Sequence, residues 1–393
     1  MEHRLLGRTE AGRPIEVLTA HAVTPATTPR DAVVLLGAHP DEDTAWSGQV
    51  LIQRLATDPG PLAGLTVHVV LCADPDGAYL NRRRGGSSLA TYFLPGGYHR
   101  PATGEQFSLQ LPLPGADAPG RRKELAATSA LRTLLDEVLD RPDAPPLIID
   151  LHRCLAGGMY AMSTERQGAL HSRLARVART VGLPLELGGE ATGDRLGPSV
   201  GAGVFLAAPA SDFTRSDVLG SPAHYAKALN PASTSLLIEV PTFLVDPVAC
   251  GAREMARWVR ETDRAVRECR RQLGDISRSA VGRAYLDRED VLCAVADELD
   301  ASVKRDGADA VSGPWPVFAT LRTTAQLAGT ALAVGVRRPQ GEEAQALHAR
   351  TVAWAQQATN ARAVPQGQAA MAHLVAVAVA VAGEAGLGMV QPR

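Results

Sequence analysis

The sequence is poor in aromatic residues, has no paired cysteine motif and has no long uninterrupted apolar run. Phe, Trp and Tyr make up 4% of its 393 residues, and its five cysteines are scattered without a CxxC pair. This pattern argues against a disulfide framework or a cysteine-rich zinc site. The longest apolar stretch, residues 369–382, is interrupted by His373 and is shorter than the roughly 20 residues of a membrane-spanning helix. We expect a buried helix there.

Neither sign of charge is in excess. The chain carries 40 Lys and Arg against 42 Asp and Glu, a formal charge of -2, so no overall field favours nucleic acid or an anionic membrane. Residues 1–7 lack the apolar run of about 7–15 residues that a secretory signal needs. Hydrophobic residues make up 45% of the chain, which is enough for a large core. We expect a soluble, cytoplasmic protein with no nucleic-acid or membrane partner.

Short apolar runs alternate with helical patterns in the first part of the chain. Residues 31–37 are typical of a strand buried on both faces of a sheet. Similar runs follow at residues 65–71, 147–151, 204–206 and 235–240, with helical patterns between them at 49–55, 125–138 and 255–266. This alternation predicts an α/β fold with a mixed, mostly parallel central sheet and helices on both faces.

The pattern changes to helices alone after about residue 277. Apolar periodicity predicts helices over residues 288–303, 319–334, 341–358 and 368–382. We therefore expect two regions, an α/β domain over residues 1–276 and a helical C-terminal region over residues 277–393. Residues 85–119 are rich in Gly, Pro and Ser, and a loop of that length is usually functional. It is expected to frame a cleft.

A histidine and a glutamate follow the first buried strand. His39 and Glu42 are three residues apart, a spacing that allows both to bind one metal. Pro40 suits the first position of a helix, which would place Glu42 in the first helical turn. Capping of that helix is the simpler explanation for the acidic residues. A second histidine, His152, ends another apolar run at the same expected edge of the sheet, where ligands collect.

Two histidines and one glutamate form a ligand set of catalytic zinc, which keeps its fourth position for water. Glu239 lies within the apolar run 235–240. An ionised carboxylate buried without a partner costs several kcal/mol, so a general base beside a metal would explain this residue. A glutamate at a strand end, paired with a surface arginine, is the alternative.

Five segments, in order, resemble the zinc metallocarboxypeptidase family. Residues 6–15 are similar to its opening segment, HPDE at 39–42 to its HxxE metal motif, and DPDG at 74–77 to its NPDG stretch. Residues 150–153 are similar to its third-ligand strand and 238–240 to its catalytic-glutamate strand. The resemblance covers roughly residues 5–273. Asp74 departs from the asparagine of the family pattern, and no clean asparagine-arginine-asparagine segment follows it.

The resemblance implies a zinc hydrolase with His39, Glu42 and His152 as ligands and Glu239 as general base. It implies hydrolysis of an amide, in a small peptide or an acylated amino acid that carries a free carboxylate. The functional arginines of the family are expected in the run 81–84 of this chain, with Arg82 in the catalytic role. The other substrate contacts that the resemblance implies are Asn81, Arg83, Arg84 and Tyr225.

Two alternatives stay open. The segment 38–43, AHPDED, is similar to the AHPDDE signature of zinc N-deacetylases, in which Asp41 would be the base. That family also needs a later HPDH-like segment, which the sequence lacks. The second alternative is an inactive carboxypeptidase-like scaffold that binds a peptide or partner. Bound metal together with turnover would exclude it.

Overall fold

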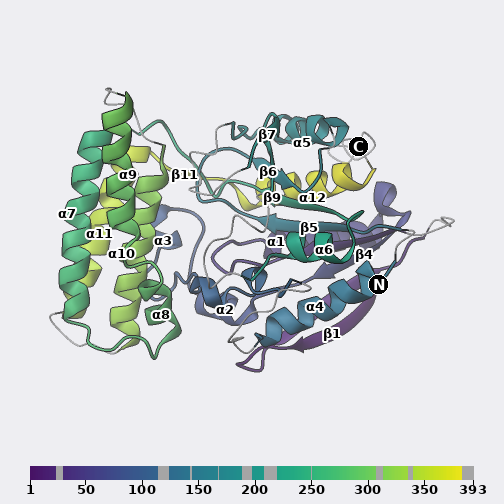
Figure 1. The fold of residues 1–393 in the computed structure, drawn as a ribbon, viewed down its shortest axis with the longest axis horizontal. Coiled ribbons are helices and arrows are strands. Elements are labelled where there is room, and N and C mark those ends of the chain that lie inside the picture. Colours follow the sequence, from purple (N-terminus) through teal and green to yellow (C-terminus); the bar gives the residue numbers. More distant parts are fainter. Residues whose placement is uncertain are drawn as a thin grey trace.

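The structure is a computed structural model, and it places two parts side by side. Figure 1 shows a twisted sheet flanked by helices and, next to it, a bundle of long helices. The residues that it describes are 1–23, 30–113, 124–141, 144–166, 168–187, 197–207, 219–248, 250–306, 313–334 and 340–382.

Nine strands among the described residues form one mixed sheet in the order β1-β2-β4-β3-β5-β9-β6-β8-β7. The neighbours β4, β3, β5 and β9 at its centre are parallel, and strands toward both edges have antiparallel neighbours. The predicted α/β fold, with a sheet that is mostly parallel at its centre, is confirmed. The strands are β1 (Glu2–Arg8), β2 (Pro14–Ala20), β3 (Arg30–Leu35), β4 (Leu65–Val70), β5 (Leu147–His152), β6 (Tyr160–Ser163), β7 (Ser199–Gly201), β8 (Val204–Leu206) and β9 (Thr234–Glu239).

Helices cover both faces of this sheet, as predicted. Alternate residues of β3 enter opposite cores, Val33 packing with α4 (Ala126–Leu139) and α6 (Pro222–Leu229). Val34 packs on the other side with α1 (Ala45–Thr57), α5 (Gly168–Val181) and α12 (Gln366–Ala382). Since successive side chains of a strand point to opposite faces, a strand covered on both sides has to be apolar throughout.

The register of the central strands places the candidate residues at one edge. Leu35 of β3 pairs with Asp150 of β5, and His152 of β5 pairs with Glu239 of β9. His39 follows β3 directly. The carboxyl ends of the three parallel strands therefore bring His39, His152 and Glu239 to the same edge of the sheet.

Five further helices form the bundle. These are α7 (Ala252–Arg271), α8 (Ala280–Leu286), α9 (Val291–Asp306), α10 (Trp315–Ala333) and α11 (Gln340–Thr359). They share one apolar core with α3 (Leu89–Tyr92). The rings of Trp258 and Trp354 stack across α7 and α11, with centroids 3.6 Å apart.

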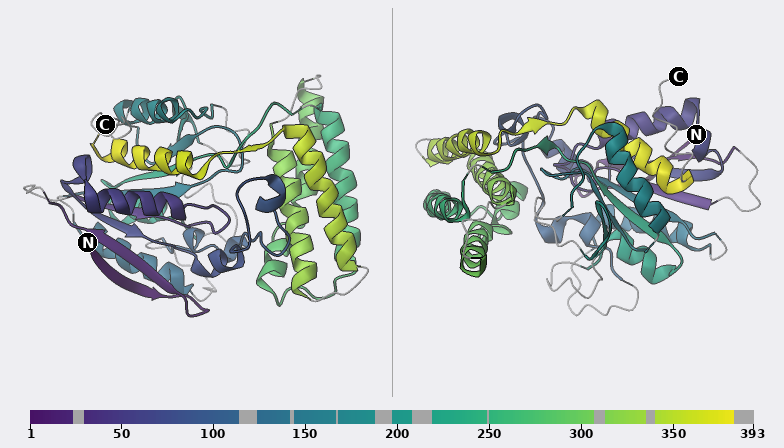
Figure 2. Two further views of the ribbon diagram at one scale, coloured as in Figure 1. Left: turned by 180° about the vertical axis from the view of Figure 1, so that it is seen from behind. Right: turned by 90° about the horizontal axis from the view of Figure 1, so that it is seen from above.

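The packing divides the chain differently from the expected boundary at residue 276. Helix α7, which precedes that boundary, belongs to the bundle, and α12, which follows it, packs on the sheet between α1 and α5 (Figure 2). The chain leaves and re-enters the α/β part through two paired strands, β10 (Phe243–Leu244) and β11 (Arg362–Ala363). The apolar Ala and Val residues all round α12 explain its return, because such a helix has to be buried on every side.

The apolar stretch 369–382 forms most of α12, as the buried helix expected there, and His373 within it is fully buried. Among the described residues, no helix has the length and apolar character required to cross a membrane.

Candidate metal centre

His39 and Glu42 lie in a turn that joins β3 to α1. The Glu42 N–H donates to the His39 carbonyl at 3.0 Å, and the Gly37 N–H donates to the Thr44 hydroxyl at 2.8 Å. Helix α1 begins only at Ala45. The expected helix start at Pro40 is therefore wrong, because residues 39–44 bond across a turn before the helix begins. Gly37 opens this turn with a φ of +66°, a conformation that glycine adopts at little cost.

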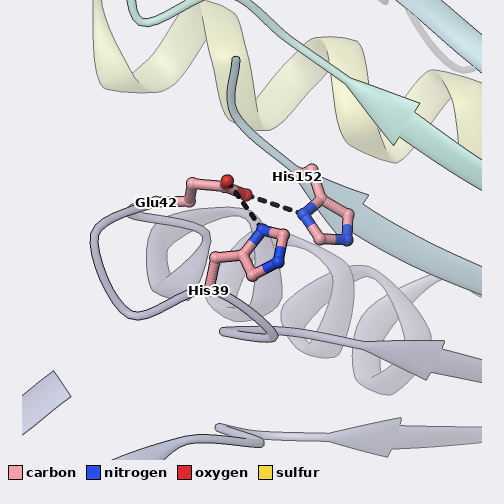
Figure 3. A group of neighbouring side chains, drawn as sticks. All are labelled: His39, Glu42 and His152. Atoms are coloured by element: carbon pink, nitrogen blue, oxygen red, sulfur yellow. Dashed lines mark hydrogen bonds and ion pairs between the residues drawn. The ribbon is translucent and has the colours of Figure 1, made fainter. Parts of the chain in front are cut away.

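The side chains of His39, Glu42 and His152 converge (Figure 3). One oxygen of Glu42 lies 2.8 Å from Nδ1 of His39, and the other lies 2.7 Å from Nδ1 of His152. The centroids of the two imidazole rings are 4.6 Å apart. One donor atom from each residue can be chosen so that all three lie within 4.8 Å of one another. Nitrogen and oxygen donors in this arrangement fit a zinc ion.

Mutual charge sets the ionisation of the three groups. Burial opposes the charge of Glu42, but His39 and His152 outweigh it and hold the pKa of Glu42 well below its usual range. Burial also opposes the charge of His152, while Asp150 and Glu42 raise its pKa well above the ordinary value. Burial, followed by the nearby Arg100, lowers the pKa of His39. Glu42 is thus ionised, as a metal ligand has to be, whereas His152 has to give up a ring proton before that nitrogen can bind a metal.

A second layer of charged and polar groups surrounds Glu42. Arg100 donates to Glu42 and to Asp41, both at 2.8 Å, and the Tyr98 hydroxyl donates to Asp41 at 3.0 Å. The main-chain N–H of Arg153 donates to Glu42 at 3.2 Å. Such outer contacts orient metal ligands.

Asp41 is fully buried, and its carboxylate accepts hydrogen bonds from Arg100 and from Tyr98. Burial alone would raise its pKa, but Arg100 and then Arg322 lower it to about 2. A carboxylate with so low a pKa is a weak base at neutral pH.

Two cavities meet at Glu42 and Arg153, which line both. The smaller has a volume of about 80 Å³ and contains the candidate ligands His39 and Glu42 together with Glu239. The larger has a volume of about 330 Å³ and contains Arg82 and Arg84. Glu239 is buried at the end of β9, beside His152. The structure thus brings the expected base and two of the expected ligands to one cavity.

The run 81–84 lies mainly around the larger cavity. Asn81 is buried and ties the main chain of Gly77 to that of His99. Arg82 is exposed, stacks on the Tyr79 ring 3.7 Å from its centroid and donates to the Tyr79 carbonyl. Arg83 is also exposed.

Arg84 is the member of this run that turns inward. It donates to the main-chain carbonyl of Asp41, and its guanidinium lies 4.4 Å from the centroid of the Tyr92 ring. Tyr225 is buried on α6, and its hydroxyl donates to Asp136 of α4 at 2.6 Å. It does not line either described cavity.

Sequence reasoning missed several residues of the smaller cavity. Arg100 lies in a segment rich in Gly and Pro that gives no periodic signal, and Arg153 lies in the segment 150–153, where the motif resemblance gives it no role of its own. Trp315 and Arg322 come from α10, which lies in the C-terminal region that the sequence pattern separates from the α/β domain. A signal for Arg322 was present, because it is the only charged residue among the 19 residues of α10. A lone charge in a buried apolar helix needs a partner or a function.

No protein-family model and no curated protein sequence matches the chain. Among solved structures, it is similar to a metallo-carboxypeptidase from Burkholderia cenocepacia, with 18% identity over 61% of this chain and 55% of that one, at a TM-score of 0.37. It is also similar to carboxypeptidase A from Helicoverpa armigera, with 16% identity over 61% and 59% of the chains and a TM-score of 0.40.

A third similar structure is the murein-tripeptide amidase from Escherichia coli O157, with 18% identity over 61% and 82% of the chains and a TM-score of 0.34. The match thus spans little more than half of the Burkholderia chain. At these TM-scores, function has to be inferred from the side chains of the site itself. The solved structures similar to this chain include metallocarboxypeptidases, the family that its sequence motifs resemble.

Proposed function

We propose that the chain is a zinc-dependent hydrolase that cleaves an amide bond, with His39, Glu42 and His152 as metal ligands. The observation that carries this proposal is the convergence of their donor atoms within 4.8 Å, at the sheet edge where the strand of Glu239 also ends. Two histidines and a glutamate are a ligand set of catalytic zinc. Zinc held there would activate a water molecule and polarise the substrate carbonyl.

Glu239 is the proposed general base. It lines the same cavity as His39 and Glu42, and the ladder between β5 and β9 fixes its position beside His152. In this role it takes a proton from the attacking water and passes it to the leaving amine. A group held on a strand is placed more accurately than one held on a loop.

The proposed substrate is a small peptide or an acylated amino acid with a free carboxylate. Arg82 and Arg84 line the larger cavity. The run 81–84 would contact a part of the substrate that is bound in this cavity. Within that run, the motif resemblance gives the catalytic role to Arg82. The guanidinium groups that line the cavity of Glu239 belong instead to Arg100, Arg153 and Arg322.

The deacetylase alternative, with Asp41 as base, has less support. Both oxygens of Asp41 accept hydrogen bonds, from Arg100 and from Tyr98, and its pKa is lowered to about 2. A carboxylate held in this way positions Arg100 rather than accepting a proton from water. The second alternative, an inactive carboxypeptidase-like scaffold, predicts that the zinc-loaded protein has no turnover.

The test uses zinc-loaded protein and a panel of dipeptides and N-acyl amino acids. Glu239→Gln is expected to retain zinc and to lose turnover by a factor on the order of 10²–10⁴. Asp41→Asn is expected to unfold more easily but to lose much less turnover per folded molecule. If Asp41→Asn is inactive and Glu239→Gln is active, the deacetylase mechanism applies. If zinc-loaded wild type hydrolyses no member of the panel, the proposed activity is wrong.

A further inference from the structure

Helix α10 of the bundle contributes to the wall of the candidate active site. Trp315 and Arg322, both on α10, line the smaller cavity with His39, Glu42 and Glu239. The cavity is therefore lined by two parts of the chain, the carboxyl edge of the sheet and one helix of the bundle. The motif resemblance, which ends near residue 273, gives no role to this helix.

The protein around Arg322 offers few hydrogen-bond or ion-pair partners to its guanidinium group. Its side chain is only 14% exposed, and its closest ion pair, to Asp41, is long at 3.8 Å. Its buried Nε has no hydrogen-bond partner among the described residues. Asp41 is already bonded to Arg100 at 2.8 Å and to Tyr98 at 3.0 Å. A buried guanidinium that lacks a close partner has a strong tendency to bind an anion.

The other two arginines of this cavity also have a buried Nε without a hydrogen-bond partner among the described residues, but each makes hydrogen bonds through an Nη atom. Arg100 is locked between Asp41 and Glu42, at 2.8 Å from each. Arg153 donates through Nη2 to the Pro241 carbonyl at 3.2 Å. Arg322 is therefore the guanidinium of this cavity with most hydrogen-bonding capacity left for a ligand.

The charges of the cavity also favour an anionic ligand. Three arginines balance Asp41, Glu42 and Glu239 in its lining. A divalent cation held by Glu42 adds two positive charges to this balance. A negatively charged group of the substrate would offset that excess.

We propose that Arg322 binds the carboxylate of the substrate, so that the bundle sets specificity for amides with a negative group close to the scissile bond. This inference rests on the proposed hydrolase function. The cavity of about 80 Å³ is small beside the 300–1,000 Å³ of typical ligand sites, so the anionic part that enters it is small. Such a group is the free carboxylate of a single amino-acid residue. Trp315 provides an apolar wall beside it.

The experiment compares N-acetyl-L-alanine with N-acetyl-L-alaninamide, which has the same shape without the charge. Binding to zinc-loaded Glu239→Gln protein is measured by calorimetry, and turnover is measured in the protein with Glu239 intact. Arg322→Met is expected to weaken binding of the acid on the order of 10- to 100-fold and to change binding of the amide less than about threefold. Arg322→Lys is expected to restore part of the difference, because it keeps the charge but loses the planar fork.

The matched control is Arg271→Met, an exposed arginine of α7 whose side chain is 73% accessible. It should leave binding of both compounds unchanged. Equal weakening of acid and amide in Arg322→Met, or no preference of the parent protein for the acid, would overturn the assignment of Arg322.

The two proposals fail in different ways. If the protein binds zinc and hydrolyses amides without preferring the acid, the hydrolase stands and the role of Arg322 is wrong. If acid binding depends on Arg322 but no amide is hydrolysed, the anion site stands and the hydrolase is wrong. The zinc content of Arg322→Met should equal that of the parent, which separates a role in substrate binding from damage to the metal site.

Discussion

Nε2 of His373 lies 2.9 Å from the main-chain carbonyl oxygen of His152, although 221 residues separate them in sequence. Burial lowers the pKa of His373 to about 3, so its ring is neutral. Nε2 therefore carries the proton and donates to the carbonyl, while Nδ1 accepts from the Ser47 hydroxyl at 2.8 Å. Through this contact, α12 braces the strand end that carries a candidate metal ligand.

His373→Leu should weaken zinc binding, because it removes the donor that fixes the His152 carbonyl. A loss of about 10- to 100-fold is typical of outer contacts of metal ligands, and metal titration with a competing chelator measures it. The matched control is His348→Leu in the bundle, a buried histidine bonded to Thr324 at 3.0 Å. It should cost stability without changing zinc affinity. Equal loss of zinc affinity in both variants would contradict the bracing role.

Gly77→Ala should disturb the turn that carries His39. A Cβ atom at Gly77 would lie 2.6 Å from Cβ of Pro40 and would clash with its ring and with Asp74. We expect a loss of about 1–3 kcal/mol of unfolding free energy, as for other overpacked sites, together with weaker zinc binding. Gly64→Ala is the control, because nothing lies within 4 Å of its Cβ position. A Gly77→Ala protein with unchanged stability and zinc affinity would refute this packing.

Asp74→Asn should become stabilising relative to wild type as the pH rises. Burial raises the pKa of Asp74 from 3.8 to about 6, although the Gly77 N–H opposes this. The folded state thus favours the protonated acid, and its contribution to stability is present below about pH 4 and lost as the pH rises through about 6. The amide of Asn can still accept from Gly77 and does not titrate. The variant should gain about 2 kcal/mol over wild type between pH 4 and 7, measured by denaturant unfolding. A difference that stays flat across this range would count against the raised pKa.

Arg84→Met should destabilise the protein, whereas Arg82→Met and Arg83→Met should not. Arg84 is bonded to the Asp41 carbonyl and stacks on Tyr92, while its two neighbours are exposed. Surface substitutions usually change the unfolding free energy by less than about 0.5 kcal/mol, and loss of a buried hydrogen bond changes it by about 1–3 kcal/mol. Chemical unfolding measures the stability of the three variants. Similar unfolding free energies for all three would contradict the structural role of Arg84. Any turnover lost in Arg82→Met then reports on substrate contact rather than on folding.

The centre of the site could be predicted because it follows from strand ends. His39 and His152 each follow a short apolar run, and parallel strands deliver such residues to one edge of the sheet. The start of α1 was mispredicted at Pro40, since a proline fits both a helical first turn and the tight turn that the structure has. Local sequence does not separate these two possibilities.

The groups around the ligands could not be predicted from local patterns. Arg100, Arg322 and His373 come from three distant segments, and only their packing brings them to Glu42, Asp41 and His152. The return of α12 to the sheet likewise depends on the space between α1 and α5. Periodicity predicts an apolar helix but does not say which apolar surface it will cover.

The metal content of purified protein tests the central claim most directly. Wild type, after dialysis against a low concentration of zinc, should retain about one zinc per chain, because three protein ligands hold the ion. His39→Ala and His152→Ala should each retain almost none. His171→Ala, which removes a buried histidine of α5 bonded to the Glu165 carbonyl, should retain the wild-type amount. Full zinc occupancy in both His39→Ala and His152→Ala, or no zinc in wild type, would contradict the metal site on which the account depends.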